Sequence, residues 1–307
     1  MSATKDHQEQ HTWYGPLMVL AGGVCIGLAP IGLRLGLDDL GPQGIAFWRF
    51  SFALPVLFVL AIGMQRRLPA KPNRFVIIAG ILFGLEMGLW HWSLTITTVA
   101  NSTFLVNLGN IGVGLAAWIF LKDRPSRMWF PAVFIAIVGA AALSLGGGVD
   151  GKADLRGDLM AVGAAVLVSL YIVASKVARR SLSGIDTIFW LTAVEVLVAA
   201  FLVVGFRENF FPSEWTGFVV PLFLGLVVHI GGQGLIVTGL GHTPAAIAGV
   251  LILIQPVVAA AISWQLFEEP LEPIQAVGGL LILVGIFVSQ CRTESKPSHE
   301  LVKPADT

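Results

Sequence analysis

Long apolar stretches alternate with short polar ones along almost the whole chain. Each stretch has about 20 residues, which is enough for a helix to cross a hydrocarbon layer of about 30 Å. The pattern therefore predicts an all-α integral membrane protein with ten transmembrane helices, at Gly15–Leu35, Pro42–Met64, Phe75–Thr97, Ser102–Leu121, Met128–Leu145, Leu155–Lys176, Ile185–Phe206, Trp215–Leu240, Ala245–Leu266 and Pro273–Cys291.

The composition agrees with burial in lipid. Hydrophobic residues make up 55% of the chain and charged residues 12%, whereas a soluble domain has about 25% charged residues. A water-soluble fold would have to bury nearly every face of these helices. Because the polar segments are short, we expect the lipid bilayer to surround the chain and expect no nucleic-acid partner or separate regulatory module.

The loops differ in their content of Lys and Arg. If the amino terminus is cytoplasmic, fourteen of the nineteen Lys and Arg residues fall on the cytoplasmic side. Cytoplasmic loops of membrane proteins carry an excess of these residues. The bias predicts a multi-pass topology with both termini in the cytoplasm. Arg49, near the outer end of the second span, is expected to extend its guanidinium to the membrane surface.

The second half of the chain repeats the first. The sequence GPLM at Gly15 returns as GDLM at Gly157, 142 residues later, and Trp118 and Trp264 match with an offset of 146. Each repeat has five spans, an odd number, so the second repeat enters the membrane from the opposite side. Two inverted five-helix repeats are typical of transporters that alternate access around a central site.

This duplication divides the chain into five parts. We predict a cytoplasmic tail at residues 1–14, a first five-helix repeat at 15–147, an external connecting loop at 148–154, a second five-helix repeat at 155–291 and a cytoplasmic tail at 292–307. A central cavity is expected between the first, third, fourth, sixth, eighth and ninth spans, because polar residues cluster there near mid-depth.

The third span combines a small-residue stripe with polar side chains. Gly80, Gly84 and Gly88 recur every four residues, which allows a neighbouring helix to approach closely. Glu86 and Trp90 share the opposite face, and His91 lies on the flank between the two faces. A charged group at the bilayer centre costs about 2.5–3.5 kcal/mol on insertion scales, so Glu86 is expected to face a cavity. The alternative is a neutral Glu86 hydrogen-bonded to a neighbouring helix.

Further polar residues in the spans complete the predicted substrate site. His229 is the near-counterpart of Glu86 in the second repeat, and Pro256 removes a backbone donor in the ninth span. The substrate-binding residues predicted on these grounds are Glu86, Trp90, His91, Asn107, Asn110, Ser169, Tyr171, His229, Gln233 and Pro256. Hydrogen bonding between helices is the alternative role of the polar residues, core packing that of Trp90 and a simple kink that of Pro256. Glu195 of the seventh span is interpreted as structural.

Several kinds of chemistry lack their usual sequence signals. We find no phosphate-cradling glycine loop, no metal-ligand cluster and no nucleophile paired with a base. We therefore expect no cofactor, no metal and no catalytic site.

Two equivalent stretches resemble a known family. The sequences NSTFLVNLGNIGVGLAAWIFLKDRP in the first half and TPAAIAGVLILIQPVVAAAISWQLFEEP in the second are similar to the EamA-type drug/metabolite transporter superfamily, and the resemblance extends from about Gly15 to Cys291. Within that superfamily the chain looks nearest to bacterial exporters of aromatic amino acids. The resemblance implies a bacterial inner-membrane transporter that exports small amphipathic metabolites, most of all aromatic or neutral amino acids, with protons as the candidate coupling ion.

Other functions stay open at this point. A broad drug or quaternary-cation exporter is the alternative within the same superfamily. An intramembrane lipid-modifying enzyme would need a reactive group at one membrane face, for which Glu86 and the histidines are the candidates. A channel is a third possibility, which the inverted repeats disfavour.

Overall fold

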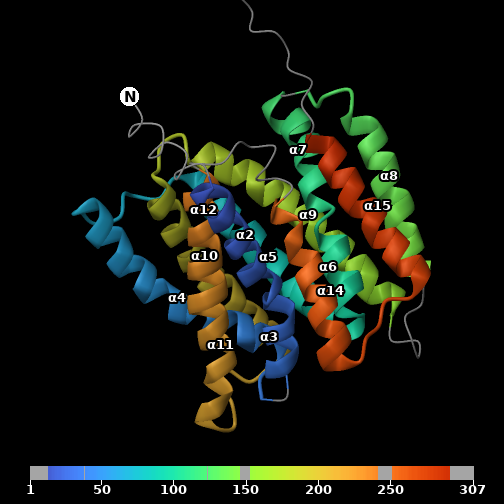
Figure 1. Cartoon of the computed structure of the whole chain (residues 1–307). Helices are drawn as coiled ribbons and strands as arrows, with labels where there is room; N and C mark the ends of the chain where they lie inside the picture. Colours follow the sequence, from blue (N-terminus) through green and yellow to red (C-terminus); the bar gives the residue numbers. More distant parts are fainter. Residues whose placement is uncertain (1–12, 38, 123, 146–152, 241–250, 291–307) are drawn as a thin grey trace, which may run out of the picture.

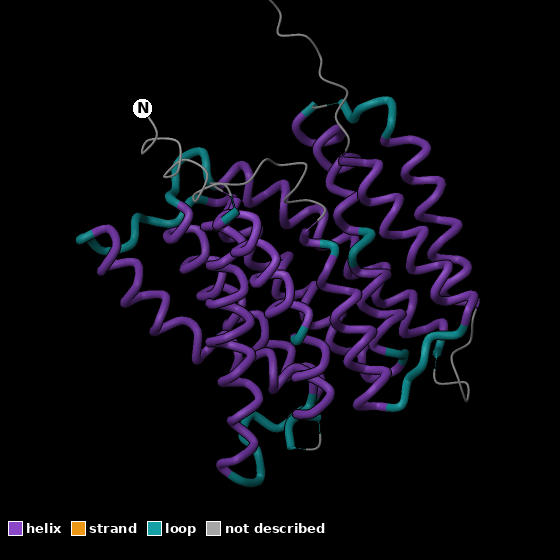
Figure 2. The backbone as a smooth tube through the Cα atoms, viewed as in Figure 1, coloured by secondary structure: helices purple, strands orange, loops and turns teal. Residues whose placement is uncertain are grey.

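The computed structural model describes residues 13–37, 39–122, 124–145, 153–240 and 251–290. All regular secondary structure in these ranges is helical (Figures 1 and 2). Seven spans are long and apolar enough to cross a membrane, and three shorter apolar helices occupy the remaining predicted positions: Trp129–Leu145, Ile254–Phe267 and Pro273–Ser289. The all-α membrane fold with two five-helix repeats is thus confirmed.

The helix boundaries follow the predicted spans closely. The first repeat contains α2 (Tyr14–Gly27), α3 (Ala29–Gly36), α4 (Pro42–Gln65), α5 (Arg74–Ile96), α6 (Val99–Val106), α7 (Gly109–Leu121) and α8 (Trp129–Leu145). The second contains α9 (Leu155–Ala178), α10 (Gly184–Phe206), the 3₁₀ turn η2 (Trp215–Phe218), α11 (Val219–Phe223), the π-helix η3 (Leu224–Gly232), α12 (Gln233–Leu240), α14 (Ile254–Phe267) and α15 (Pro273–Gln290). Cys291 and residues 245–250 of the predicted spans lie outside the described residues.

Three predicted spans are interrupted rather than continuous. The first is divided at Leu28, the fourth at Asn107–Leu108 and the ninth at Leu253. The second and third breaks are related by the same offset of 146 residues that relates the repeats. Pro256 therefore stands in the first turn of α14, where its missing N–H is tolerated. The sequence placed Pro256 near the middle of a helix, with a simple kink as its alternative role, whereas the structure places it near the start of one.

The contacts between the two repeats follow the duplication: each helix pair either joins equivalent helices or recurs between their counterparts. α5 packs along α9, and their counterparts α12 and α2 pack along each other; α4 packs along α10, and α8 along α15 (Figure 1). A Cβ atom on Gly139 would lie 2.7 Å from the Gly278 carbonyl oxygen, and one on Gly285 would lie 2.8 Å from that of Ala132. These two contacts are exchanged by the 146-residue offset, as expected for a pseudo-two-fold axis.

The glycine stripe of α5 packs against α10. Cβ atoms added at Gly80, Gly84 and Gly88 would lie within 2.8 Å of Val194, Val198 and Leu202 respectively. Trp92 continues the stripe by stacking edge to face on Phe206, with ring centroids 4.2 Å apart. The predicted close helix contact is confirmed, and its partner is α10.

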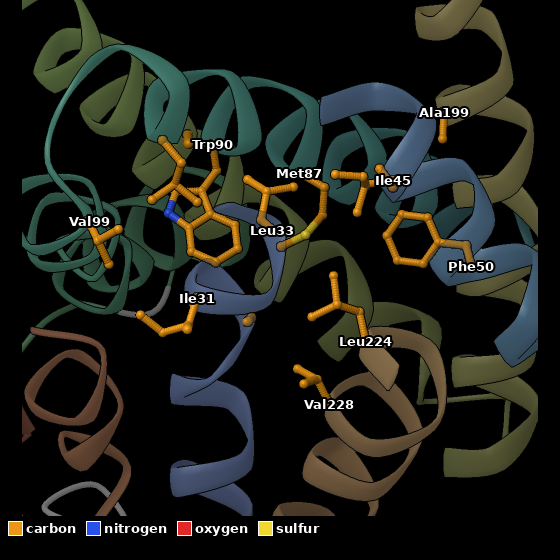
Figure 3. Packing of buried hydrophobic residues seen from close by; sticks show 14 of the residues in the cluster. Ile31, Leu33, Ile45, Phe50, Met87, Trp90, Val99, Ala199, Leu224 and Val228 are labelled. Carbon is orange, nitrogen blue, oxygen red and sulfur yellow. The ribbon is translucent and has the colours of Figure 1, made fainter. Parts of the chain in front are cut away.

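The largest apolar cluster lies where α3, α4, α5 and η3 meet. Figure 3 shows Leu33, Ile45, Met87, Leu224 and Val228 directed toward one another in this cluster. Trp90 belongs to the same cluster. This core holds together the helices that carry the polar residues described next.

Candidate functional site

A central cavity of about 230 Å³ lies between the two repeats. The six spans predicted to line it all contribute residues, and α4 contributes Arg49 in addition. Six of the ten predicted substrate-binding residues line this cavity: Glu86, Trp90, Asn107, Asn110, Tyr171 and Gln233.

The other four predicted residues lie elsewhere. Ser169 lies in the contact between α7 and α9. Its hydroxyl is within donating distance of two backbone carbonyl oxygens, that of Ala165 at 2.8 Å and that of Gly109 at 3.0 Å. His91 Nδ1 lies 3.1 Å from the Pro42 carbonyl oxygen at the start of α4. Pro256 is buried beside Gln255, which does line the cavity. His229 borders a second cavity.

The sequence predicted that Arg49 extends to the membrane surface, but the structure places this residue in the interior of the bundle. Its side chain is buried, with a relative exposure of 4%, and it lines the central cavity. Its Nη1 atom lies 3.9 Å from Met87 Sδ, and its guanidinium lies 5.7 Å from the Phe50 ring centroid. η3 packs closely on α4 at this point, since a Cβ atom on Gly225 would be 2.5 Å from the Arg49 carbonyl oxygen. Other helices therefore cover this part of α4, and the Arg49 side chain lies in the interior of the bundle.

Four buried polar atoms of the central cavity have no hydrogen-bond partner among the residues that the structure describes: Arg49 Nε, Glu86 Oε2, Trp90 Nε1 and Thr103 Oγ1. Buried polar groups are normally paired, so each unpaired group needs an explanation. Their convergence on one cavity provides donors and an acceptor for a polar ligand. The walls beside them are apolar, because Phe83, Met87 and Val106 also line the cavity.

Asn107 and Asn110 mark the break between α6 and α7. Asn107 Nδ2 donates to the Thr103 carbonyl oxygen at 2.7 Å, and Asn110 Nδ2 donates to that of Asn107 at 3.1 Å. These amide donors satisfy backbone groups that the break exposes. The geometry therefore favours the structural role that the sequence left open for these donors, while both side chains still line the cavity.

A second cavity of about 160 Å³ adjoins the first. It extends from Glu195, Thr192 and His229 to the exposed Arg179 at the end of α9. Three residues line both cavities: Phe83, Tyr171 and Gln233. The Phe83 and Tyr171 rings are in contact, with centroids 4.6 Å apart, and so form part of the wall between the two cavities.

The end of the bundle where α3 and α14 lie, at the bottom of Figure 1, contains an ion pair between the two repeats, and we infer that it closes the central cavity on this side. Arg34 Nη1 lies 2.9 Å from Glu269 Oε1, and the two side chains are 21% and 4% exposed. Arg34 also donates to the carbonyl oxygens of Leu94 and Thr97, and Glu269 Oε2 accepts from the backbone N–H of Val99. This ion pair joins α3, α5, α6 and the end of α14.

A second group of polar side chains extends the same closure toward α9 and α15. Asp158 accepts hydrogen bonds from Thr97 Oγ1 at 2.7 Å and from Asn101 Nδ2 at 3.1 Å. Gln275 Nε2 donates to Asn101 Oδ1 at 3.0 Å. Polar contacts therefore join six spans at this end of the bundle.

We expect Glu269→Gln to loosen this closure, because the variant removes the negative charge that holds Arg34. A cysteine at Asn110, in a protein whose Cys25 and Cys291 are replaced by serine, should then react several-fold faster with a membrane-impermeant thiol reagent added on the α14–α15 loop side. Glu268→Gln is the matched control, since Glu268 is an exposed neighbour. Equal labelling rates in the parent and Glu269→Gln proteins would show that the ion pair does not close the cavity.

Comparisons with known proteins agree with this architecture. The model of the EamA-like transporter family matches the chain twice, at residues 13–145 and 155–290. The uncharacterized transporter YwfM of Bacillus subtilis is 26% identical over 249 residues, which cover 79% of this chain and 82% of that protein. The pseudopaline exporter CntI of Pseudomonas aeruginosa is 23% identical over 252 residues, which cover 78% and 83% of the two chains.

A solved structure shares the fold at low sequence identity. It is 19% identical, covers 92% of this chain and 96% of its own, and superimposes with a TM-score of 0.58. Because the family model matches both halves of the chain, we conclude that the chain belongs to the EamA-like transporter family and is a multi-pass membrane transporter.

Proposed function

We propose that this transporter exports small amphipathic metabolites, with neutral and aromatic amino acids as its substrates, by alternating access around the central cavity. The observation that carries the proposal is the combination of Arg49 and Glu86, each with an unpaired buried polar atom, in one cavity with apolar walls. A zwitterion with an apolar side chain has the complementary groups.

Each part of such a substrate has a suitable binding group among the residues that line the cavity. The Arg49 guanidinium is suited to bind a carboxylate through paired N–H donors. The Glu86 carboxylate is suited to accept hydrogen bonds from an ammonium group. Trp90 and Phe83 offer aromatic faces for the substrate side chain, and Trp90 Nε1 remains available as a donor.

The size of the cavity argues against the drug or quaternary-cation alternative. Sites for drug-sized ligands have volumes of about 300–1,000 Å³, whereas the central cavity measures about 230 Å³. A cation without a carboxylate would also offer no acceptor to the buried Arg49 Nε donor, and an unmade hydrogen bond in a buried position is costly. The similarity to a pseudopaline exporter supports export of a metabolite as the direction of transport.

The orientation is part of the same proposal. We assign both termini to the cytoplasm of a bacterial inner membrane, because the loops on that side carry the excess of Lys and Arg. The first residues of α2 and the last of α15 lie at the same end of the bundle, at the top of Figure 1, which agrees with an even number of crossings. In this orientation the Arg34–Glu269 ion pair closes the outer end.

Counterflow in proteoliposomes tests the function. Vesicles loaded with unlabelled phenylalanine should accumulate external labelled phenylalanine, whereas empty vesicles and vesicles without protein should not. An excess of tyrosine or leucine should compete, and a lipophilic quaternary cation should not. Competition by the cation alone would favour the alternative exporter, and turnover of a lipid by the purified protein would favour the enzyme.

Trp90→Ala is expected to weaken transport of aromatic substrates more than that of small ones. Ring stacking adds about 0.5–1.5 kcal/mol beyond area burial, which corresponds to roughly a twofold to tenfold rise in the half-saturating concentration of phenylalanine. Alanine transport should change less. Trp264→Ala, at an exposed position of α14, is the matched control. An equal loss for phenylalanine and alanine would assign Trp90 to core packing alone.

A further inference from the structure

The second cavity contains a buried acid–base pair. His229 Nε2 lies 3.9 Å from Glu195 Oε2, and the Thr192 hydroxyl lies 2.9 Å from the same imidazole nitrogen. The Glu195 and His229 side chains are only 1% and 4% exposed. Within the described part of the chain, Glu195 Oε2 and His229 Nδ1 nevertheless have no hydrogen-bond partner. Both atoms therefore retain the capacity to bind a proton or a hydrogen-bonding ligand.

The charges around this pair do not balance. α10 packs against α4 and α5, and Arg49 interacts electrostatically with both Glu195 and Glu86. The titratable groups facing Glu195 from the neighbouring helices are Arg49, Glu86, Tyr171 on α9 and His229 on η3. One guanidinium thus faces two carboxylates. Because an unbalanced charge is costly in a buried site, balance requires either one proton, which neutralises Glu195 or makes His229 positively charged, or a positively charged ligand.

Water can reach this pair from one end of the molecule. The second cavity extends from Glu195 and His229 to the exposed Arg179 and to Gly184 at the turn between α9 and α10. Its volume of about 160 Å³ is small for an organic substrate but accommodates water. Phe83 and Tyr171 form part of its wall toward the central cavity.

We propose that Glu195 and His229 form a proton-binding site that couples transport to a proton gradient. The proposal rests on the proposed amino-acid transport function. One proton enters from water through the second cavity, binds the Glu195 carboxylate or the His229 imidazole, and later returns to water, so no covalent bond to the substrate is involved. Arg49 links the two sites and makes them antagonistic: a proton bound at Glu195 leaves Arg49 to pair with Glu86, whereas loss of that proton draws Arg49 toward Glu195 and frees Glu86 for the substrate ammonium, so that a proton is exchanged for a substrate.

The test compares two rates in the same proteoliposomes: phenylalanine counterflow without a pH gradient, and phenylalanine uptake driven by an imposed pH gradient. In the wild type, the gradient should change the rate at least about fivefold, the lower end of typical coupling between two sites. In Glu195→Gln, imposing the gradient should leave the uptake rate unchanged. Glu214→Gln, an exposed glutamate in the loop before η2, should keep the wild-type response.

The outcomes separate this inference from the proposed function. Counterflow in the wild type without any response to the gradient would overturn proton coupling and leave amino-acid transport intact. Absence of phenylalanine counterflow in the wild type would overturn the transport function on which the inference rests. A Glu195→Gln protein with the full wild-type response would assign the proton to another group. If Glu195→Gln fails to fold, Thr192→Val takes its place in the gradient test, because it removes the hydroxyl beside His229. A pH-sensitive dye inside vesicles with the wild-type protein should in addition report proton movement when phenylalanine is added, and no dye response would contradict proton coupling.

Discussion

Replacing Glu86 by glutamine is expected to lower phenylalanine counterflow by at least about tenfold while the protein still folds. Glutamine keeps the shape of the side chain and one acceptor oxygen, but it removes the charge. Hydrogen bonds to charged groups contribute about 1.5–3 kcal/mol, and 1.4 kcal/mol corresponds to a factor of ten. The variant should therefore lose the ammonium-binding wall of the cavity, with the loss visible as a higher half-saturating concentration.

Two further variants show whether the loss is specific. Arg49→Gln should be at least as damaging, because it removes the carboxylate-binding guanidinium, and Arg49→Lys should retain part of the activity. Glu214→Gln, whose side chain is exposed, should transport at the wild-type rate. Wild-type rates in a well-expressed Glu86→Gln protein would mean that this glutamate only stabilises the contact between helices.

The second large effect concerns folding. Gly84→Leu is expected to destabilise the protein strongly, because even a Cβ atom at this position would lie 2.8 Å from Val198 Cβ. Overpacking a close contact typically costs about 1–3 kcal/mol, occasionally more, and a leucine adds three further carbons. The expected result is a lower melting temperature in detergent and a lower yield of folded protein.

Gly205→Ala is the control for this experiment. A Cβ atom there would have no neighbour within 4 Å, and Gly205 lies on α10, the same helix that Gly84 contacts. Since alanine is the better helix former, this variant should keep or slightly raise the melting temperature. A melting temperature of Gly84→Leu equal to that of Gly205→Ala would show that α5 and α10 are not in close contact.

Much of the fold could be predicted because hydrophobic length and duplication are local properties of the sequence. The ends of α4, α5, α8 and α10 fall within one residue of the predicted spans, and the glycines of α5 identified a close helix contact before its partner was known. The breaks within the predicted spans were harder to predict from the sequence. Hydropathy does not distinguish a continuous span from one divided at Leu28 or Leu253, although Pro30 and Pro256 just after these breaks were visible signals.

The site was predicted only in part because the direction of a side chain depends on which helix covers it. Arg49 has the sequence position of a residue that reaches the surface, but η3 packs on α4 at Gly225 and the Arg49 side chain lines the central cavity. Glu195 was interpreted as structural because its span was taken to be peripheral. α10 in fact packs on both α4 and α5, which brings Glu195 beside His229 and within electrostatic reach of Arg49.

Competition by substrate analogues tests the central claim most directly, namely that one cavity binds both the carboxylate and the ammonium of its substrate. Wild-type counterflow of labelled phenylalanine should be inhibited by unlabelled phenylalanine much more strongly than by phenylethylamine, which lacks the carboxylate, or by phenylpropionate, which lacks the ammonium. Arg49→Gln should abolish the advantage of phenylalanine over phenylethylamine. Inhibition by phenylethylamine that equals or exceeds that by phenylalanine would contradict the account and identify an exporter of cations.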